Sequence, residues 1–386
     1  MICELKKSEY EKVRPLYEEL NFYLITTAVI EGTSPGRIWV DNADHPEIAF
    51  LISPEGYFVA GTSSNTEFNV SLKTLLTSTI IPERSKKGEQ YIALHYHPDT
   101  WESTIERMLE EKVPLKSCGY FFKLSELKVT DWKERIPPGF QMVQVDRNFL
   151  KRTDLKNHDT ITDHIESHFN SPQDFLQHGI GFCLVHGDII VSWSLADCVS
   201  GISCEIGIAT DEEYRRQGFA AITAAATVEY CLSNNFTEIG WHTGTTNIGS
   251  IKTAEKVGFV KRKDEKSYFS WFHKIDNFIE HGFYSWLNGQ YKESAQWYER
   301  AIAVTESGEY QSFQIPLYHS AQAICFYAAC SWAMAEEIEL SFRNLYKAAK
   351  DVKNSRQFAE RLKTSESLRY LQGTEEWEKL IETLEK

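Results

Sequence analysis

The stretch from Cys204 to Leu232 constrains the fold more than any other part of the chain. Apolar residues stand at alternate positions over 204–210, which predicts a strand. The segment 220–232 is rich in alanine and free of Gly and Pro, which predicts a helix. Between them runs Tyr214-Arg215-Arg216-Gln217-Gly218-Phe219-Ala220. A strand, a glycine-centred turn and a helix together form an arrangement that suits a bound phosphate.

The physical basis of this prediction is the start of the helix. Its first backbone N–H groups have no intrahelical acceptor, and the helix dipole adds partial positive charge there. Gly218 lets the backbone approach an anion where a Cβ would intrude. Arg215 and Arg216 add forked cationic donors. The segment is therefore a candidate phosphate-binding loop.

The pattern Arg215-x-x-Gly218-x-Ala220 resembles the pyrophosphate loop of the GNAT acetyltransferases. The sequence that follows extends the resemblance. Thr237–Thr243 is a strand pattern, and Asn247 opens a helix that closes on Gly258-Phe259. These are similar to strand five and the asparagine-led helix four of that family. Because a short motif counts only in its context, the order of the three elements favours the family over an unrelated Arg-rich helix start.

Length and composition limit the class of protein. A chain of 386 residues predicts two or three domains. There is no apolar run of the length that a membrane span needs, and the first residues lack the apolar core of a signal peptide. The eight cysteines include no CxxC pair, which favours reduced thiols. We expect a cytoplasmic protein without a membrane association.

Charge argues against nucleic acid as a partner. The formal net charge is −14, and no basic face is evident. A local group of cations around the loop, with Lys252 and Lys256 beside the two arginines, suits an anionic ligand such as coenzyme A.

The resemblance implies tandem domains of the GNAT α/β (α+β) fold. Residues 1–137 contain strand patterns such as Gly36–Asn42, which resembles the N-terminal half of the branch that includes zwittermicin A resistance acetyltransferases. That half carries no cofactor loop, and we expect it to shape the substrate cleft. Pro137-Pro138-Gly139 breaks the chain, so residues 138–276 are expected to form the catalytic domain. Its predicted order is strand, helices, three antiparallel strands, helix, strand, helix and strand.

The third expected domain, 277–386, is all-α. Gly282, Ser285, Ser294, Tyr298 and Ala301 recur 47 positions later as Ala329, Trp332, Ser341, Leu345 and Ala348. The stretch from Asn288 to Ile302 resembles a tetratricopeptide (TPR) repeat. A small TPR-like array and an ordinary helical bundle both remain open, since about three repeats are usual for a stable array. A protein partner for this domain is an expectation from the resemblance alone.

The resemblance also implies roles for individual residues. Ile208, Ala209 and Thr210 are expected to pair with the amides of the pantetheine arm as an added strand. Arg216, Gln217, Gly218, Phe219 and Ala220 are expected to offer backbone N–H groups to the pyrophosphate, with side-chain charge from Arg215. Asn247 and Ser250 are expected to contact the pantetheine arm. A backbone N–H near Ile208 is expected to polarise the thioester carbonyl.

The proton chemistry is less fixed by the sequence. Glu205 lies on the strand that several GNAT enzymes use for a general base, and a strand carboxylate that faces solvent or pairs with a lysine is the alternative. Ala254 stands where the family often places a tyrosine that protonates the leaving thiolate, so the general acid is not identified.

Two features of 158–168 are weighed for substrate and metal binding. Asp159, Asp163 and Glu166 are a hypothetical attractor for a cationic amine. His164 and His168 have the spacing of zinc helices, but Ile165 stands where the metalloprotease pattern needs glutamate. We expect no metal.

These observations favour an acetyl-CoA-dependent N-acetyltransferase that acts on a primary amine of a small molecule, by direct attack in a ternary complex. An antibiotic or a metabolite that bears an amine fits equally. The alternative is an inactive coenzyme A-binding scaffold whose helical domain binds a protein. Ala254 favours the scaffold, and the intact loop with Asn247 favours catalysis.

Overall fold

The computed structural model describes residues 2–307, 320–350, 352 and 354–386. The chain divides into two compact units. One comprises Met1–Leu72, Ala93–Ile105 and Lys116–Tyr268, and the other comprises Lys73–Ile92, Glu106–Leu115 and Phe269–Lys386. Among the helices of the described ranges, none has the length and apolar character needed to cross a membrane.

Twelve strands form one sheet in the order β1-β2-β3-β4-β5-β12-β6-β11-β10-β9-β8-β7. Their bounds are β1 Cys3–Glu4, β2 Arg37–Val40, β3 Ile48–Ser53, β4 Gly56–Gly61, β5 Tyr91–His97, β6 Leu115–Leu124, β7 Phe140–Gln144, β8 Ile180–His186, β9 Ile189–Ser200, β10 Ser203–Thr210, β11 Glu238–Gly244 and β12 Phe259–Trp271. β4 with β5 and β10 with β11 run parallel, whereas β2 with β3 and β8 with β9 are antiparallel hairpins. The sheet is therefore mixed.

The α-helices have the following bounds: α1 Leu24–Glu31, α2 Thr66–Leu75, α3 Ile81–Lys86, α4 Glu102–Met108, α5 His158–His168, α6 Pro172–His178, α7 Phe219–Ser233, α8 Ile248–Val257, α9 Lys274–Leu287, α10 Tyr291–Glu306, α11 Ala321–Met334, α12 Ile338–Lys350, α13 Ser355–Thr364 and α14 Glu375–Glu385. The spacing of the apolar residues Tyr10, Val13, Leu16, Tyr17 and Leu20 predicts a helix near the N-terminus, and the structure has a 3₁₀ helix over Lys7–Leu20, with Pro15 inside it. Proline offers no N–H for α-type bonding, which is one reason for the tighter form.

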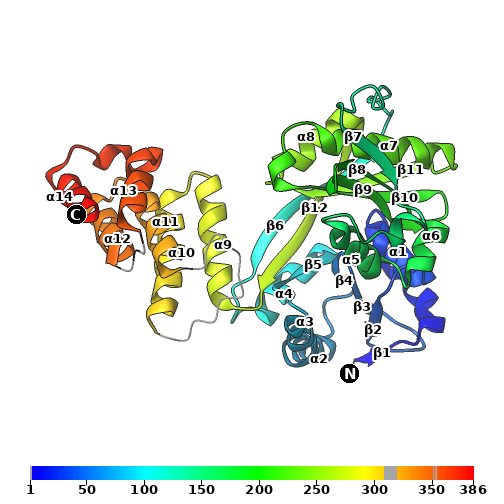
Figure 1. The fold of residues 1–386 in the computed structure, drawn as a ribbon. Coiled ribbons are helices and arrows are strands. Elements are labelled where there is room, and N and C mark those ends of the chain that lie inside the picture. The colour runs from blue at the N-terminus through cyan, green and yellow to red at the C-terminus, as the bar shows by residue number, and fades with distance from the viewer. Residues whose placement is uncertain (1, 308–319, 351, 353) are drawn as a thin grey trace. The chain divides into compact units, whose positions relative to one another are not determined.

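The order expected for 138–276 is confirmed by the described residues. β7, α5 and α6, the strands β8 to β10, then α7, β11, α8 and β12 follow one another along the chain. Figure 1 shows α7 and α8 on one face of these strands and α1, α5 and α6 on the other. Side chains on the two faces of the sheet, those of β10 included, therefore pack against different helices.

The sheet runs across the position expected as a domain boundary. β6 precedes Pro137 in the sequence but pairs antiparallel with β11, with Trp241 opposite Phe122. β12, which follows it, lies between β5 and β6. Each half of the sequence thus contributes a strand to the middle of the shared sheet.

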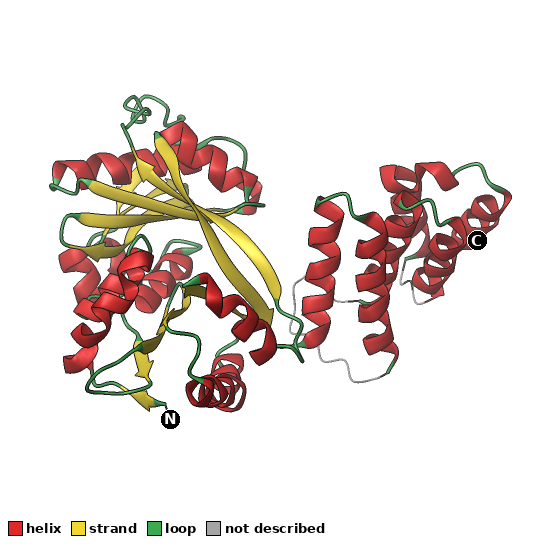
Figure 2. Ribbon diagram, turned by 180° about the vertical axis from the view of Figure 1, so that it is seen from behind, coloured by secondary structure: helices red, strands yellow, loops and turns green. Residues whose placement is uncertain are grey.

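The C-terminal helices repeat one hydrogen bond at the offset seen in the sequence. Ser294 Oγ donates to the Gly282 carbonyl at 2.7 Å, and Ser341 Oγ donates to the Ala329 carbonyl at 2.8 Å. The first bond joins α10 to α9 and the second joins α12 to α11, helices that Figure 2 shows side by side. The internal repeat is therefore a structural repeat of two helix pairs.

Gly258→Ala should destabilise the first unit. Gly258 has φ +122°, and a Cβ there would lie 1.8 Å from the Glu126 carbonyl oxygen. Backbone cannot move aside cheaply, so we expect a loss of at least about 2 kcal/mol in the free energy of unfolding. Gly187→Ala is the matched control, because Gly187 also has positive φ (+61°) but nothing within 4 Å of its Cβ position. Urea denaturation of both variants measures the difference, and equal losses would contradict this account.

Candidate functional site

β10 and β11 pair only at their beginnings. Ser203, Cys204 and Glu205 lie opposite Glu238, Ile239 and Gly240 in parallel register. Beyond this point β10 continues with β9 alone, while Trp241 to Gly244 pair with β6. Among the described strands, the edge of β10 from Ile206 to Thr210 therefore has no partner on the β11 side. Such an edge offers backbone N–H and C=O groups to an extended ligand.

The predicted phosphate loop lies directly after this free edge. Gly218 caps the start of α7 with φ +87°, and Arg216 also has positive φ, +62°. In the described part of the chain, the backbone N–H groups of 217–220 have no acceptor. A Cβ at Gly218 would meet only Lys256 Nζ, at 3.6 Å. The loop thus combines free donors, a cation and open space, which fits a diphosphate.

The residues expected to bind the cofactor lie along one path. Ile208, Ala209 and Thr210 are half-buried on the free edge, and Arg215, Arg216 and Gln217 are exposed in the loop. The ring of Phe219 is buried in the core, so only its backbone can face a ligand.

The remaining two expected contacts lie at the head of α8, and each has a partner within the protein. Asn247 Oδ1 accepts the Ser250 N–H at 3.1 Å, and Ser250 Oγ accepts Trp241 Nε1–H at 3.0 Å. These bonds position the start of α8. Ala254 in the same helix is fully buried and lies within the core, so this position offers no proton donor.

Glu205 is held at the point where β10 and β11 diverge. Its Oε1 accepts the Leu24 N–H at 2.8 Å and lies 3.0 Å from His242 Nε2. His242 Nδ1 is bonded to Glu265, so the imidazole bridges two carboxylates. Glu205 is 5% exposed, and its Oε2 is buried with no hydrogen-bond partner in the described part of the chain. The alternative in which this strand carboxylate faces solvent is therefore wrong.

The bridging histidine carries the compensating charge. Burial alone would lower the pKa of His242, but the carboxylates of Glu205 and Glu265 raise that pKa well above its usual value. The imidazolium therefore persists at neutral pH. Burial also lowers the pKa of His95 to about 4, so this neighbouring ring is uncharged there.

A second polar group lies beside the free edge of β10 at Gly207, two residues after Glu205. Asp197 is the extra residue of β9 where its register with β10 shifts, and its Oδ2 lies 2.9 Å from His164 Nε2. Gly207 makes room for this carboxylate, since a Cβ there would lie 2.2 Å from Asp197 Oδ2.

His164, His168 and Asp197 have ligand atoms within 4.8 Å of one another, so the chain does supply a third candidate ligand that the sequence did not reveal. The two rings are stacked, with centroids 4.0 Å apart and planes at 24°. A metal–nitrogen bond lies in the ring plane, and nearly parallel planes at this spacing do not converge at bonding distance. This arrangement suits packing better than metal binding.

Glu55, Cys198 and Glu205 form the other group of potential ligands, also within 4.8 Å of one another. Burial raises the pKa of the Cys198 thiol well above its usual value, so the sulfur stays protonated and is a poor metal ligand. Two carboxylates alone fall short of the oxygen shell that Ca²⁺ or Mg²⁺ takes in proteins.

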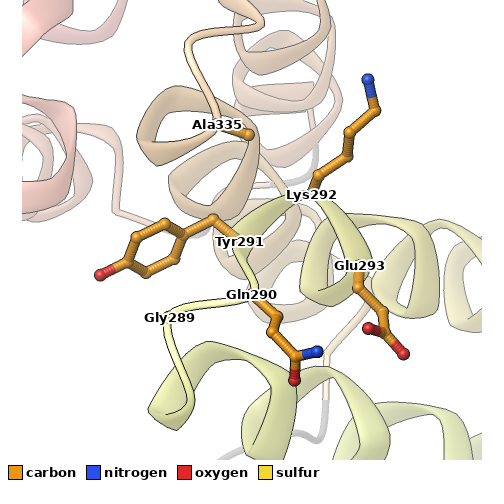
Figure 3. Close-up of a pocket in the computed structure, with 6 residues that line it drawn as sticks. All are labelled: Gly289, Gln290, Tyr291, Lys292, Glu293 and Ala335. Atoms are coloured by element: carbon orange, nitrogen blue, oxygen red, sulfur yellow. The ribbon is translucent and has the colours of Figure 1, made fainter.

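Other candidate features are not part of the cluster at Glu205. Asp159, Asp163 and Glu166 are exposed on α5. A pocket of about 420 Å³ occurs among the C-terminal helices, lined by Gly289, Gln290, Tyr291, Lys292, Glu293 and Ala335. Figure 3 shows it at the turn before α10. Its polar side chains form no nucleophile–base pair.

Sequence reasoning missed four residues of the site: Glu55, Asp197, His242 and Glu265. Each lies far from the others in sequence. The pairing of β10 with β9 and β11 brings Asp197 and His242 to Glu205, whereas Glu55 comes from the turn between β3 and β4 and Glu265 from β12. Glu265 lies in the charged run 261–266, where most side chains are exposed, so the sequence gives no indication that this one is buried. Only a predicted register could have revealed the cluster.

Comparison with known proteins gives the family context. A family model described as GNAT acetyltransferase matches residues 14–268. The "Uncharacterized N-acetyltransferase YdfB" of Bacillus subtilis (strain 168) is 24% identical over 272 residues, which are 70% of this chain and 99% of that protein. The crystal structure of a GCN5-related N-acetyltransferase-like protein from Streptococcus suis 89/1591 aligns with a TM-score of 0.54 and 22% identity, covering 68% of this chain and 98% of that one. The match to the family model ends before α9, so the C-terminal helices lie outside it.

His242→Gln should destabilise the protein in a pH-dependent way. Because the folded-state pKa of His242 is raised, its stabilising contribution is fully present below the unfolded pKa and is lost as pH rises through the folded pKa. Removing the charge leaves two buried carboxylates unpaired, and we expect a loss of about 3 kcal/mol at pH 6 that shrinks as the pH rises through the raised folded-state pKa of His242. Urea denaturation across this range measures it, with His178→Gln on the exposed end of α6 as control. A loss that does not vary with pH would contradict a charged His242.

Proposed function

The chain belongs to the GNAT acetyltransferase family and is therefore an acyltransferase, and from this premise we propose that it transfers the acetyl group of acetyl-CoA to a primary amine of a small molecule. One observation carries the proposal. The unpartnered edge of β10 leads into a loop with free backbone donors and a positive-φ glycine. A single ligand that carries both an extended arm and a diphosphate fits this path.

The residues along the path have distinct roles in the proposal. Bound acetyl-CoA supplies an acetyl thioester, which is activated toward amines. The N–H groups of 216–220 bind its diphosphate, with added charge from Arg215. The edge at Ile208, Ala209 and Thr210 pairs with the amides of the arm, and the N–H near Ile208 polarises the thioester carbonyl. Asn247 and Ser250 flank the arm from the start of α8.

Glu205 is the proposed proton acceptor. Its Oε1 is held by Leu24 N–H and His242, which fixes the carboxylate in place. Its Oε2 is buried and has no hydrogen-bond partner among the described residues, so it is available to an N–H of the substrate. Glu205 takes one proton from the substrate ammonium. The neutral amine then attacks the thioester carbonyl carbon, the C–S bond breaks as the C–N bond forms, and the second amine proton leaves with the sulfur as the coenzyme A thiol. Direct attack in a ternary complex needs no acyl-enzyme intermediate.

The finer expectations from the sequence are kept as proposals. They comprise the tandem arrangement of residues 1–137 and 138–276, the likeness to zwittermicin A resistance acetyltransferases, a TPR-like character for 277–386 with a protein partner, and a cytoplasmic location. The repeated serine-to-carbonyl bonds of the C-terminal helices support a repeat architecture.

Gly218→Glu should abolish binding of acetyl-CoA. In the wild type, acetyl-CoA at 100 times its dissociation constant should add about 2.7 kcal/mol of stability. The variant places a carboxylate where the diphosphate lies, so its stabilisation by the ligand should vanish. Gly201→Glu is the matched control, because Gly201 also has positive φ (+57°) and open space but lies in the turn before β10. Thermal unfolding with and without acetyl-CoA measures all three proteins. Equal ligand shifts in both variants would place the cofactor elsewhere.

Glu205→Gln should slow acetyl transfer while leaving acetyl-CoA binding intact. Loss of the proton acceptor should lower kcat by about 10²-fold or more. Release of free coenzyme A thiol with a panel of primary amines measures the rate. Glu238→Gln is the control, because Glu238 is a half-buried carboxylate at the start of the adjacent β11 that pairs with Lys123. If the wild type binds acetyl-CoA normally but acetylates no amine, that result would favour the inactive scaffold.

A further inference from the structure

The turn between β3 and β4 brings a carboxylate from the N-terminal half of the sequence to Glu205. Ser53 pairs with Gly56, so Pro54 and Glu55 are the two residues of the turn. Ser53 Oγ accepts the Glu55 N–H at 3.2 Å and donates to the Gly56 carbonyl at 3.0 Å, which fixes the turn. Residues at such turn tips usually face water. Here the Glu55 carboxylate instead lies within 4.8 Å of a Glu205 oxygen and of Cys198 Sγ.

The charges around these two carboxylates do not balance. The titratable groups near Glu55 are Glu205, Asp197, Cys198, His242, Glu265, His95 and Tyr23. His242 is the cation among them, and it is already shared between Glu205 and Glu265. Asp197 is paired with His164. Glu55 therefore adds a carboxylate that no cation among these groups offsets.

Glu205 supplies an independent sign of a missing partner. The residue is 5% exposed, and Oε2 is buried without a hydrogen bond in the described part of the chain. An unpaired buried carboxylate oxygen costs free energy unless a proton or a cation occupies the space beside it. The nearby Glu55 oxygen makes that cost greater.

We infer that Glu55 and Glu205 together bind the protonated amine of the acceptor substrate, so that Glu55 selects a cationic primary amine. An ammonium group offers three N–H donors, which suits two converging carboxylates. The inference rests on the proposed function and deepens it, because it assigns the acceptor end of the site. It also gives residues 1–137, which lack a cofactor loop, a direct part in substrate recognition. Glu55 binds and Glu205 accepts the proton.

The inference makes a prediction that needs no catalysis. Burial, reinforced by the Glu205 charge, raises the pKa of Glu55 well above its ordinary value. A carboxyl with a raised folded-state pKa destabilises the fold as pH rises above its unfolded pKa. Glu55→Gln removes this cost. At pH 8, the melting temperature of the free variant should exceed that of the wild type by about 3 °C, whereas at pH 4 the difference should vanish.

The test adds probe amines to the full chain at pH 8 and follows thermal unfolding. Ethylamine and spermidine hydrochlorides should stabilise the wild type and the control Glu47→Gln, which changes an exposed carboxylate just before β3. They should not stabilise Glu55→Gln. Tetramethylammonium chloride, which has charge but no N–H donor, should have no effect in any of the three proteins.

Acetyl-CoA is tested in the same thermal-unfolding experiment, so that a failure of this inference can be distinguished from a failure of the proposed function. An acetyl-CoA shift retained in Glu55→Gln shows that the variant is folded, and its absence from the wild type would count against the proposed function alone. Equal amine responses in wild type and Glu55→Gln would overturn the inference. So would a response to MgCl₂ or CaCl₂ in place of amines. A third result would also overturn the inference: a higher melting temperature of Glu55→Gln while amines fail to stabilise the wild type. It would show that Glu55 and Glu205 share a proton and do not bind an amine.

Discussion

The short parallel contact between β10 and β11 is the constraint on which the rest of the site depends. The strands separate after Glu205 and Gly240 because β11 turns to β6 while β10 stays with β9. At that point the chain buries two carboxylates, Glu205 and Glu265, around His242. Buried charges of this kind are costly unless paired, and the charged His242 between the two carboxylates offsets that cost. The separation of β10 from β11 therefore accounts for both the free edge of β10 and the buried network at its start.

The N-terminal half of the sequence takes part in the same geometry. Its strand β6 receives β11, and the Leu24 N–H binds Glu205. The turn that carries Glu55 approaches the same carboxylate. The N-terminal half thus contributes a backbone hydrogen bond and a carboxylate to the surroundings of β10. The repeated helix pairs of the C-terminal region are built differently, from small residues and serine-to-carbonyl bonds.

Local pattern was enough to predict the strand, the loop and the helix of the proposed cofactor path, but not the cluster of buried groups at Glu205. The alternation in β10, the alanines of α7 and the glycine at 218 each act over a few residues, so the sequence shows them directly. Asn247 also caps α8 as its position predicts. The cluster at Glu205 depends on register between strands far apart in sequence, which no local pattern records. The short helix α1 was missed for another reason: Ile25, Thr26, Thr27, Val29 and Ile30 are β-branched and disfavour a helix, and packing against β9 overrides that preference.

Amide hydrogen exchange with and without acetyl-CoA tests the central claim most directly. If the open edge of β10 holds the cofactor arm, added acetyl-CoA should slow exchange at 206–210 and at 216–220. The paired residues Ser203 to Glu205 should change little, because β11 already protects them. Protection confined to other segments, or no protection at either stretch, would contradict the account.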